Sequence, residues 1–134
     1  HDELRRVAPV GGAAVAAGPR GETVAAWRDG GGGWLAAGRF GRLAGGIPVV
    51  TGLTAAPGGL LTAVSDGSVH TLWLSADAGR AWRPVAAPAP LPAGAERDVA
   101  VAATAERTVL LADDGGGGRV WVTDGPLTRA GQGR

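Results

Sequence analysis

The segment LLTAVSDGS, Leu60–Ser68, is a run of mainly apolar residues that ends in an Asp-Gly pair at Asp66–Gly67. Aspartate and glycine tolerate the backbone angles of tight turns, so Asp-Gly after an apolar run is a strong signal for a β-hairpin. The same arrangement occurs in TVAAWRDGGGG, Thr23–Gly33, and in TVLLADDGGGG, Thr108–Gly118. These three segments indicate an internal repeat built from short strands.

Further apolar runs flank each segment. The preceding runs are Ala13–Gly21, Gly52–Gly59 and Val99–Arg107, and the following runs are Trp34–Gly38, Thr71–Ser75 and Arg119–Thr123. Each unit is therefore expected to be a strand, a turn, a second strand, an Asp-Gly turn and a third strand. The aspartates of the three Asp-Gly pairs occupy positions 29, 66 and 114, so the second interval is longer than the first.

The fold class follows from these runs. Glycine and proline interrupt the alanine-rich stretches before any helical periodicity develops, and Val, Leu, Thr and Trp favour strands. Repeats of about 40 to 50 residues with three or four short strands are typical of β-propeller blades. We expect an all-β fold of three blade-like antiparallel units, either a partial propeller or one completed by self-association. A β-sandwich with a similar number of strands is the alternative.

The domain organisation follows from the same repeat. We expect a single β-repeat domain over residues 1–134, with units at about 8–43, 47–87 and 97–128. The Pro/Ala-rich segment 84–96 is expected to be a linker that lengthens the second interval, and 129–134 a flexible tail. Three units are fewer than the about four to eight blades of a closed propeller. The chain is therefore a piece of a longer protein, an open array, or a self-associating chain that closes a six-unit ring.

Composition narrows the classes of function. The 134 residues include 13 arginines, no lysine, 12 acidic residues and no cysteine, which gives a net charge of +1. The arginines are scattered, whereas proteins that bind nucleic acids gather basic residues on one face, so we expect no nucleic-acid partner. No apolar run is close to the length of about 18 residues that a transmembrane helix needs, so we expect no membrane span.

The source and the location are inferred from codon bias and from the first residues. Lysine, asparagine, tyrosine and methionine have AT-rich codons and are missing, which indicates a high-GC bacterium. The charged start, HDELRR at residues 1–6, is followed by no apolar segment, so no signal peptide is expected. We expect a mature secreted or extracytoplasmic protein, although an excised chain fits these residues equally well.

One segment resembles a known motif. In SADAGRAW, residues 75–82, Ser75, Asp77, Gly79 and Trp82 follow the pattern Ser-x-Asp-x-Gly-x-x-Trp. This pattern is similar to the Asp-box, or BNR repeat, of sialidase-like β-propellers. The resemblance implies a structural turn between the third and fourth strands of a blade, remote from any active site. There the aspartate accepts hydrogen bonds from backbone N–H groups, and the glycine adopts a backbone conformation that a Cβ disfavours. The tryptophan packs over the hairpin.

The other units match this motif less well. Thr123, Asp124 and Gly125 look like a shortened Asp-box without the closing tryptophan. The first unit continues as WLAAGRF, Trp34–Phe40, in which no box is expected.

The resemblance also allows a test for sialidase activity. Sialidases use a tyrosine nucleophile and three arginines that hold the substrate carboxylate. This chain has no tyrosine, and Gly46 precedes Ile47–Pro48 where the Arg-Ile-Pro signature has arginine. His70 lies on the same hairpin as Ser68 and Asp66, and one hairpin does not supply the converging geometry of a triad. We therefore expect no enzymatic activity, no metal and no cofactor.

Binding is the remaining class of function. Five arginines near expected loops are candidates to bind anionic sugars or an acidic protein, or are solvated residues that reflect codon bias: Arg28, Arg39, Arg42, Arg80 and Arg83. Four tryptophans in expected strands are assigned to packing, with carbohydrate stacking as the alternative: Trp27, Trp34, Trp73 and Trp121. We expect a non-catalytic binding or assembly module whose partner is a protein, a glycan or a second copy. The alternatives are a fragment of a glycoside-hydrolase-like propeller with its catalytic residues elsewhere, and an intracellular structural partner.

Overall fold

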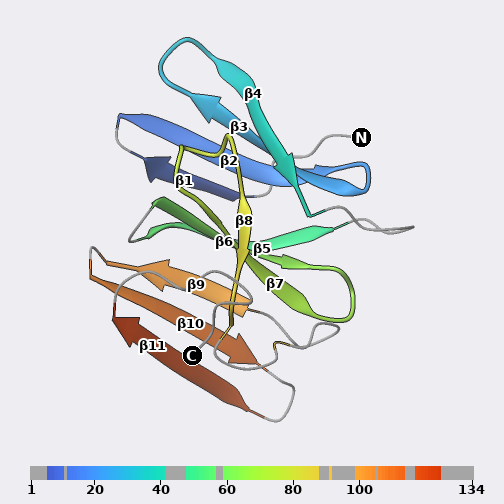
Figure 1. Ribbon diagram of the computed structural model, residues 1–134, viewed down its shortest axis with the longest axis vertical. Coiled ribbons are helices and arrows are strands. Elements are labelled where there is room, and N and C mark those ends of the chain that lie inside the picture. Colours follow the sequence, from blue (N-terminus) through green and yellow to red (C-terminus); the bar gives the residue numbers. More distant parts are fainter. Residues whose placement is uncertain are drawn as a thin grey trace.

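The structure is a computed structural model that describes residues 6–10, 12–41, 48–56, 59–87, 91, 99–104, 106–113 and 117–124. All regular secondary structure in these ranges is β, which confirms the predicted fold class. The strands form three antiparallel sheets that are stacked along the long axis of the molecule and do not close on themselves (Figure 1). This arrangement fits either a partial propeller or a sandwich.

The first sheet contains four strands in sequence order: β1 (Arg6–Val10), β2 (Ala13–Arg20), β3 (Thr23–Asp29) and β4 (Trp34–Phe40). The last three are the expected strands of the first unit, whereas the repeat pattern does not predict β1 as a separate strand. It pairs with β2 at the edge of the sheet, where its Pro9 lies opposite Ala14. An edge position tolerates a proline, which has no N–H to donate.

The second sheet also contains four strands in sequence order: β5 (Val49–Ala56), β6 (Gly59–Ser65), β7 (His70–Ser75) and β8 (Arg83–Val85). β8 occupies the beginning of the segment that the composition predicts to be a linker, so residues 84 and 85 belong to the sheet. Its Pro84 lies opposite Trp73 at the outer edge. The linker prediction is therefore wrong for these two residues.

The third sheet contains β9 (Val99–Ala103), β10 (Arg107–Asp113) and β11 (Gly118–Asp124), with β10 in the centre. β6 begins at position 59 and β10 at position 107, and the same interval separates the start of β7 at position 70 from the start of β11 at position 118. We call this constant interval of 48 positions the repeat interval. It relates the second sheet to the third.

The structure corrects the alignment of the first unit. Asp29–Gly30 follows β3 and precedes β4, whereas Asp66–Gly67 lies between β6 and β7, the second and third strands of their sheet. The residue of the second sheet that corresponds to Asp29 is not Asp66 but Asp77 of the Asp-box, which comes one repeat interval after Asp29. The shorter spacing between Asp29 and Asp66 therefore compares two different turns.

The sheets contact one another through their first strands and through apolar cores. β5 lies against both β1 and β9, so the first strands of the three sheets are neighbours. Between the first and second sheets, the ring of Phe40 stacks on Trp82 at 4.5 Å between centroids and lies 5.2 Å from Trp73. Between the second and third sheets the buried residues include Leu61, Ala63, Leu72, Leu74, Val99, Leu110 and Ala112.

Candidate functional site

The Asp-box residues form one closed network, which we call the Asp77 loop (Ser75–Trp82). The Ser75 hydroxyl donates to Asp77 Oδ1 at 2.9 Å and accepts from the Gly79 N–H at 2.9 Å. Asp77 Oδ1 also accepts from the Ala81 N–H at 2.9 Å. Trp82 Nε1 donates to the Gly79 carbonyl at 2.9 Å, so the indole is fixed across the loop.

Backbone conformation and charge complete this turn. Gly79 adopts a φ of 91°, which favours glycine, and Ala78 adopts a φ of 60°. The N–H of Ala81 and the hydroxyl of Ser75 lower the pKa of Asp77 because both stabilise its ionised form. The carboxylate of Asp77 is thus directed at its own loop, which makes it a stabiliser of the turn.

The Asp77 loop packs on the first sheet. A Cβ at Gly38 of β4 would collide with the Arg80 carbonyl and would lie 2.7 Å from the Gly79 carbonyl. A Cβ at Gly79 would lie 3.2 Å from Val15 and 3.4 Å from Ala26, on β2 and β3. The loop therefore connects two strands of the second sheet and packs against three strands of the first.

A second turn of the same kind lies nearby, the Asp29 loop (Asp29–Trp34). Asp29 Oδ1 accepts from the N–H groups of Gly31 at 2.8 Å and Gly33 at 3.2 Å. Gly31, with a φ of 112°, and Trp34 follow Asp29 at the spacing at which Gly79 and Trp82 follow Asp77. Trp27 replaces the serine of the motif.

The first unit therefore has a turn with part of the Asp-box pattern, which lacks the serine and precedes the segment Trp34–Phe40 in which no box is expected. The Asp-x-Gly-x-x-Trp pattern at positions 29–34 is the signal in the sequence. The sequence alignment of the units hides it, because that alignment assigns Asp29–Gly30 to a different turn of the repeat.

A cleft of about 510 Å³ lies beside the two loops and is the candidate site. Arg28 of β3 and Arg80 of the Asp77 loop line it together with three glycines of the Asp29 loop and with residues 35–37 of β4. Two of the five candidate arginines, far apart in the sequence, thus meet in one cavity. The other walls are glycine backbone and small apolar side chains.

The guanidinium groups in the cleft have no carboxylate partner among the residues that the structure describes. Arg28 lies opposite both Val15 and Leu35 in the sheet, on the face that the Asp77 loop covers. Its Nε is shielded from solvent and finds no hydrogen-bond acceptor within those same ranges. An unpaired guanidinium in a partly enclosed cavity favours an anion there.

The remaining candidate arginines lie elsewhere. Arg39 is exposed on β4 opposite Ala25 and does not line the cleft. Arg83 of β8 lines a smaller hollow of about 170 Å³ together with Asp77 and Trp82. Arg42 lies outside the described residues.

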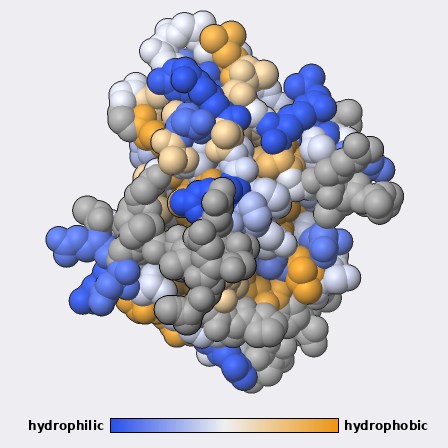
Figure 2. Space-filling view, viewed as in Figure 1, coloured by the Kyte–Doolittle hydropathy of each residue, from blue (hydrophilic) through white to orange (hydrophobic). Residues whose placement is uncertain are grey.

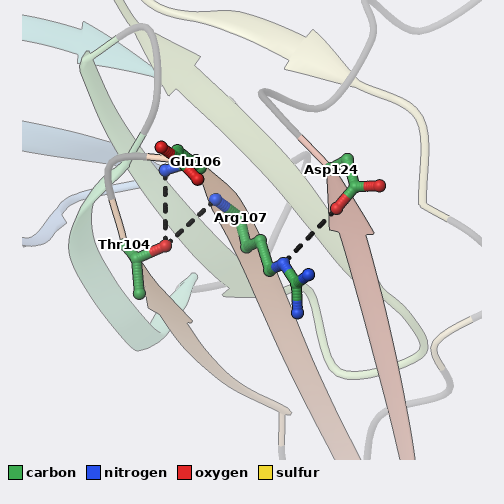
Figure 3. A network of polar contacts seen from close by, with 4 residues as sticks. All are labelled: Thr104, Glu106, Arg107 and Asp124. Carbon is green, nitrogen blue, oxygen red and sulfur yellow. Dashed lines mark hydrogen bonds and ion pairs between the residues drawn. The ribbon is translucent and has the colours of Figure 1, made fainter.

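The shortened box of the third unit differs from the Asp77 loop. The carboxylate of Asp124 pairs with Arg107 Nε at 3.4 Å across the two strands (Figure 3), and both side chains are exposed. The Thr123 hydroxyl is enclosed without a hydrogen-bond partner among the described residues. Thr123 follows Ser75 by one repeat interval, so Asp124 comes one position too early to replace Asp77. Gly125 lies outside the described residues.

In the hairpin that contains His70, the Asp66 carboxylate stabilises the turn. Asp66 Oδ1 accepts from the N–H groups of Ser68 at 2.8 Å and Val69 at 2.9 Å, and these bonds lower the pKa of Asp66. His70 is buried at the start of β7, and within the described part of the chain its ring nitrogens have no hydrogen-bond partner. The Asp66 carboxylate thus accepts hydrogen bonds from the backbone of its own turn and does not orient the imidazole of His70.

The described ranges support neither a metal site nor a membrane-spanning helix. No group of three or more His, Cys, Asp or Glu side chains converges there to hold a metal ion. The same ranges contain no helix long and apolar enough to cross a membrane. Of the four tryptophans assigned to packing, Trp73 and Trp121 contact the cores, Trp27 is half-buried and Trp34 is exposed.

Comparison with known proteins adds no assignment, because no family model, no curated protein sequence and no solved structure matches this chain.

Proposed function

We propose that the chain is a non-catalytic segment of three propeller units, two of them with an Asp-box-type turn, that binds a small carboxylate-bearing ligand, of the acidic-sugar class, in the cleft beside the Asp29 and Asp77 loops. The single observation that carries the proposal is the meeting of Arg28 and Arg80 in that cleft without a counter-ion among the described residues.

The propeller part of the proposal is supported by three features. The first strands β1, β5 and β9 are neighbours, as the inner strands of successive blades are. The repeat interval relates two strands of the second sheet to two strands of the third, and it also relates Asp29 to Asp77. The Asp29 and Asp77 loops each follow the third strand of a four-stranded sheet, where the resemblance to sialidase-like propellers places the Asp-box.

The ligand class follows from the chemistry of the walls. Guanidinium groups bind carboxylates through charge-assisted and often bidentate hydrogen bonds. Leu35 and the neighbouring alanines offer an apolar surface for the carbons of a sugar ring. The volume of about 510 Å³ is within the range of small-molecule sites, about 300 to 1,000 Å³.

Isothermal titration calorimetry tests this proposal with glucuronate as the ligand and glucose as its neutral counterpart. We expect glucuronate to bind and glucose not to bind, because only glucuronate carries a carboxylate for Arg28 and Arg80. The substitutions R28Q and R80Q each remove one cation, and each should weaken binding by about tenfold or more.

R39Q is the matched control, since Arg39 lies on β4 but outside the cleft, and it should leave the affinity unchanged. Equal binding of glucose and glucuronate, or equal losses in R28Q and R39Q, would overturn the assignment of the ligand to this cleft.

A further inference from the structure

Both faces of the second sheet are covered by other sheets. Ala63, Leu72 and Leu74 pack against the third sheet and are at most 2% exposed. Leu60 and Val64, on the opposite face, pack against the first sheet. We call the face that bears Ala63 the rear face and the face that bears Val64 the front face. Each sheet therefore meets the next one rear to front.

The rear face of the third sheet carries the same kind of residues and is exposed. Leu111, Val120 and Val122 come one repeat interval after Ala63, Leu72 and Leu74, respectively. They are 48%, 62% and 55% exposed, in the same order.

These side chains form a continuous apolar surface. Leu111 lies directly opposite Val120 on one side and Ala100 on the other, and Val109 lies opposite Val122. In Figure 2, apolar surface reaches the lower edge of the molecule, where Figure 1 places the third sheet. A surface that is buried at the equivalent place of the repeat is thus left open here.

The front face of the first sheet is the complementary surface. Ala17 of β2 packs towards the second sheet, so the adjacent Ala16 lies on the front face, where it is buried at the floor. The exposed part of this face contains Val7 and Pro9 of β1 and Trp34, Ala36 and Arg39 of β4, and Val7 is 62% exposed opposite Ala16. Apart from Arg39, these side chains are apolar and offer a surface that the Leu and Val side chains of a rear face can cover.

We propose that the rear face of the third sheet docks on the front face of the first sheet in a second copy of this chain. The contact continues the rear-to-front series that the chain already makes twice, between its first and second and between its second and third sheets. Two copies that dock reciprocally close a ring of six sheets, and both exposed faces are buried in the same step. The net charge of +1 opposes this association only weakly.

Light scattering on a sizing column tests the docking with the chain itself and three variants. We expect the wild type to have twice the 13.2 kDa mass of one chain. V120E places a charge on the rear face and V7E places one on the front face, and each should raise the dimer dissociation constant on the order of a hundredfold.

V69E is the matched control, because Val69 is similarly exposed, at 45%, but lies in the turn before β7. It should remain dimeric. Thermal unfolding followed by circular dichroism shows whether each variant still folds, and a variant that does not fold is replaced by Val122→Glu or Pro9→Glu on the same faces.

Mixing the two monomeric variants distinguishes rear-to-front docking from other arrangements. V7E retains an intact rear face and V120E an intact front face, so the mixture should regain the mass of two chains. A wild-type monomer at all concentrations would overturn the proposal. So would a V7E variant that remains dimeric alone, which indicates rear-to-rear pairing, or a ladder of larger masses, which indicates an open array. Ala36 of β4 borders both the cleft and the docking face, but the docking does not use the two arginines of the cleft, so R28Q and R80Q should remain dimeric.

Discussion

Ser75 and Asp77 stabilise the same turn but differ in burial. Ser75 is fully buried, and its hydroxyl is the acceptor for the buried Gly79 N–H. Asp77 is exposed, and its carboxylate accepts hydrogen bonds from the Ser75 hydroxyl and the Ala81 N–H. The serine therefore contributes at every pH, whereas the contribution of the aspartate depends on its ionisation.

This difference predicts how stability changes with pH. The pKa of Asp77 is lowered in the folded chain, so its contribution is present above the unfolded value of about 3.9 and is lost as the pH falls through the folded value. D77N retains an acceptor oxygen but has no charge. The wild type should therefore lose more free energy of unfolding than D77N as the pH falls from neutrality to below 4.

Urea unfolding at a series of pH values measures this effect. D66N should flatten the curve in the same way, because backbone N–H groups of Val69 and Ser68 lower the pKa of Asp66. Parallel curves for the wild type and D77N over the whole range would contradict the account of the Asp77 loop.

Among the elements, β4 and the Asp77 loop depend on a close approach of their backbones. Gly38 has no side chain at the point where the carbonyls of Gly79 and Arg80 meet the strand. G38A should lower the free energy of unfolding by about 2–3 kcal/mol, the upper part of the range for overpacking, because backbone has to move. It should also weaken glucuronate binding, since Arg80 moves with the loop.

Urea unfolding and calorimetry measure the two effects. G12A is the control, because no atom lies within 4 Å of a Cβ at Gly12, and it should stay within about 0.5 kcal/mol of the wild type. If G38A were as stable as G12A and bound glucuronate normally, the packing of the loop on β4 would be unimportant to the site.

The strands also show which parts of the fold the sequence patterns predict. Long apolar runs such as Leu60–Ser65 predict strands correctly because hydrophobic periodicity and turn residues act locally. The same patterns do not reveal β1 and β8, which are short and contain Pro9 and Pro84 at the edges of their sheets. The two Asp-Gly turns at 29 and 66 look equivalent in sequence because the pair signals a hairpin without indicating which two strands it joins.

At the scale of the whole molecule, stacking creates features that no local pattern contains. The sequence offers no reason to prefer Arg28 or Arg80 over Arg39. The stacking of the first two sheets brings Arg28 and Arg80 into one cleft and leaves Arg39 on a different surface. The open rear face is equally hidden, because Leu111 and Val120 resemble core residues in sequence and are exposed where no described strand covers them.

The most direct test of the proposed binding site is an amide NMR spectrum of the isotope-labelled chain during titration with glucuronate. The account predicts shifts concentrated at Gly30, Gly32 and Arg80, and no such shifts with glucose. Shifts that gather instead around Arg107 and the third sheet, or that are the same for both sugars, would contradict it.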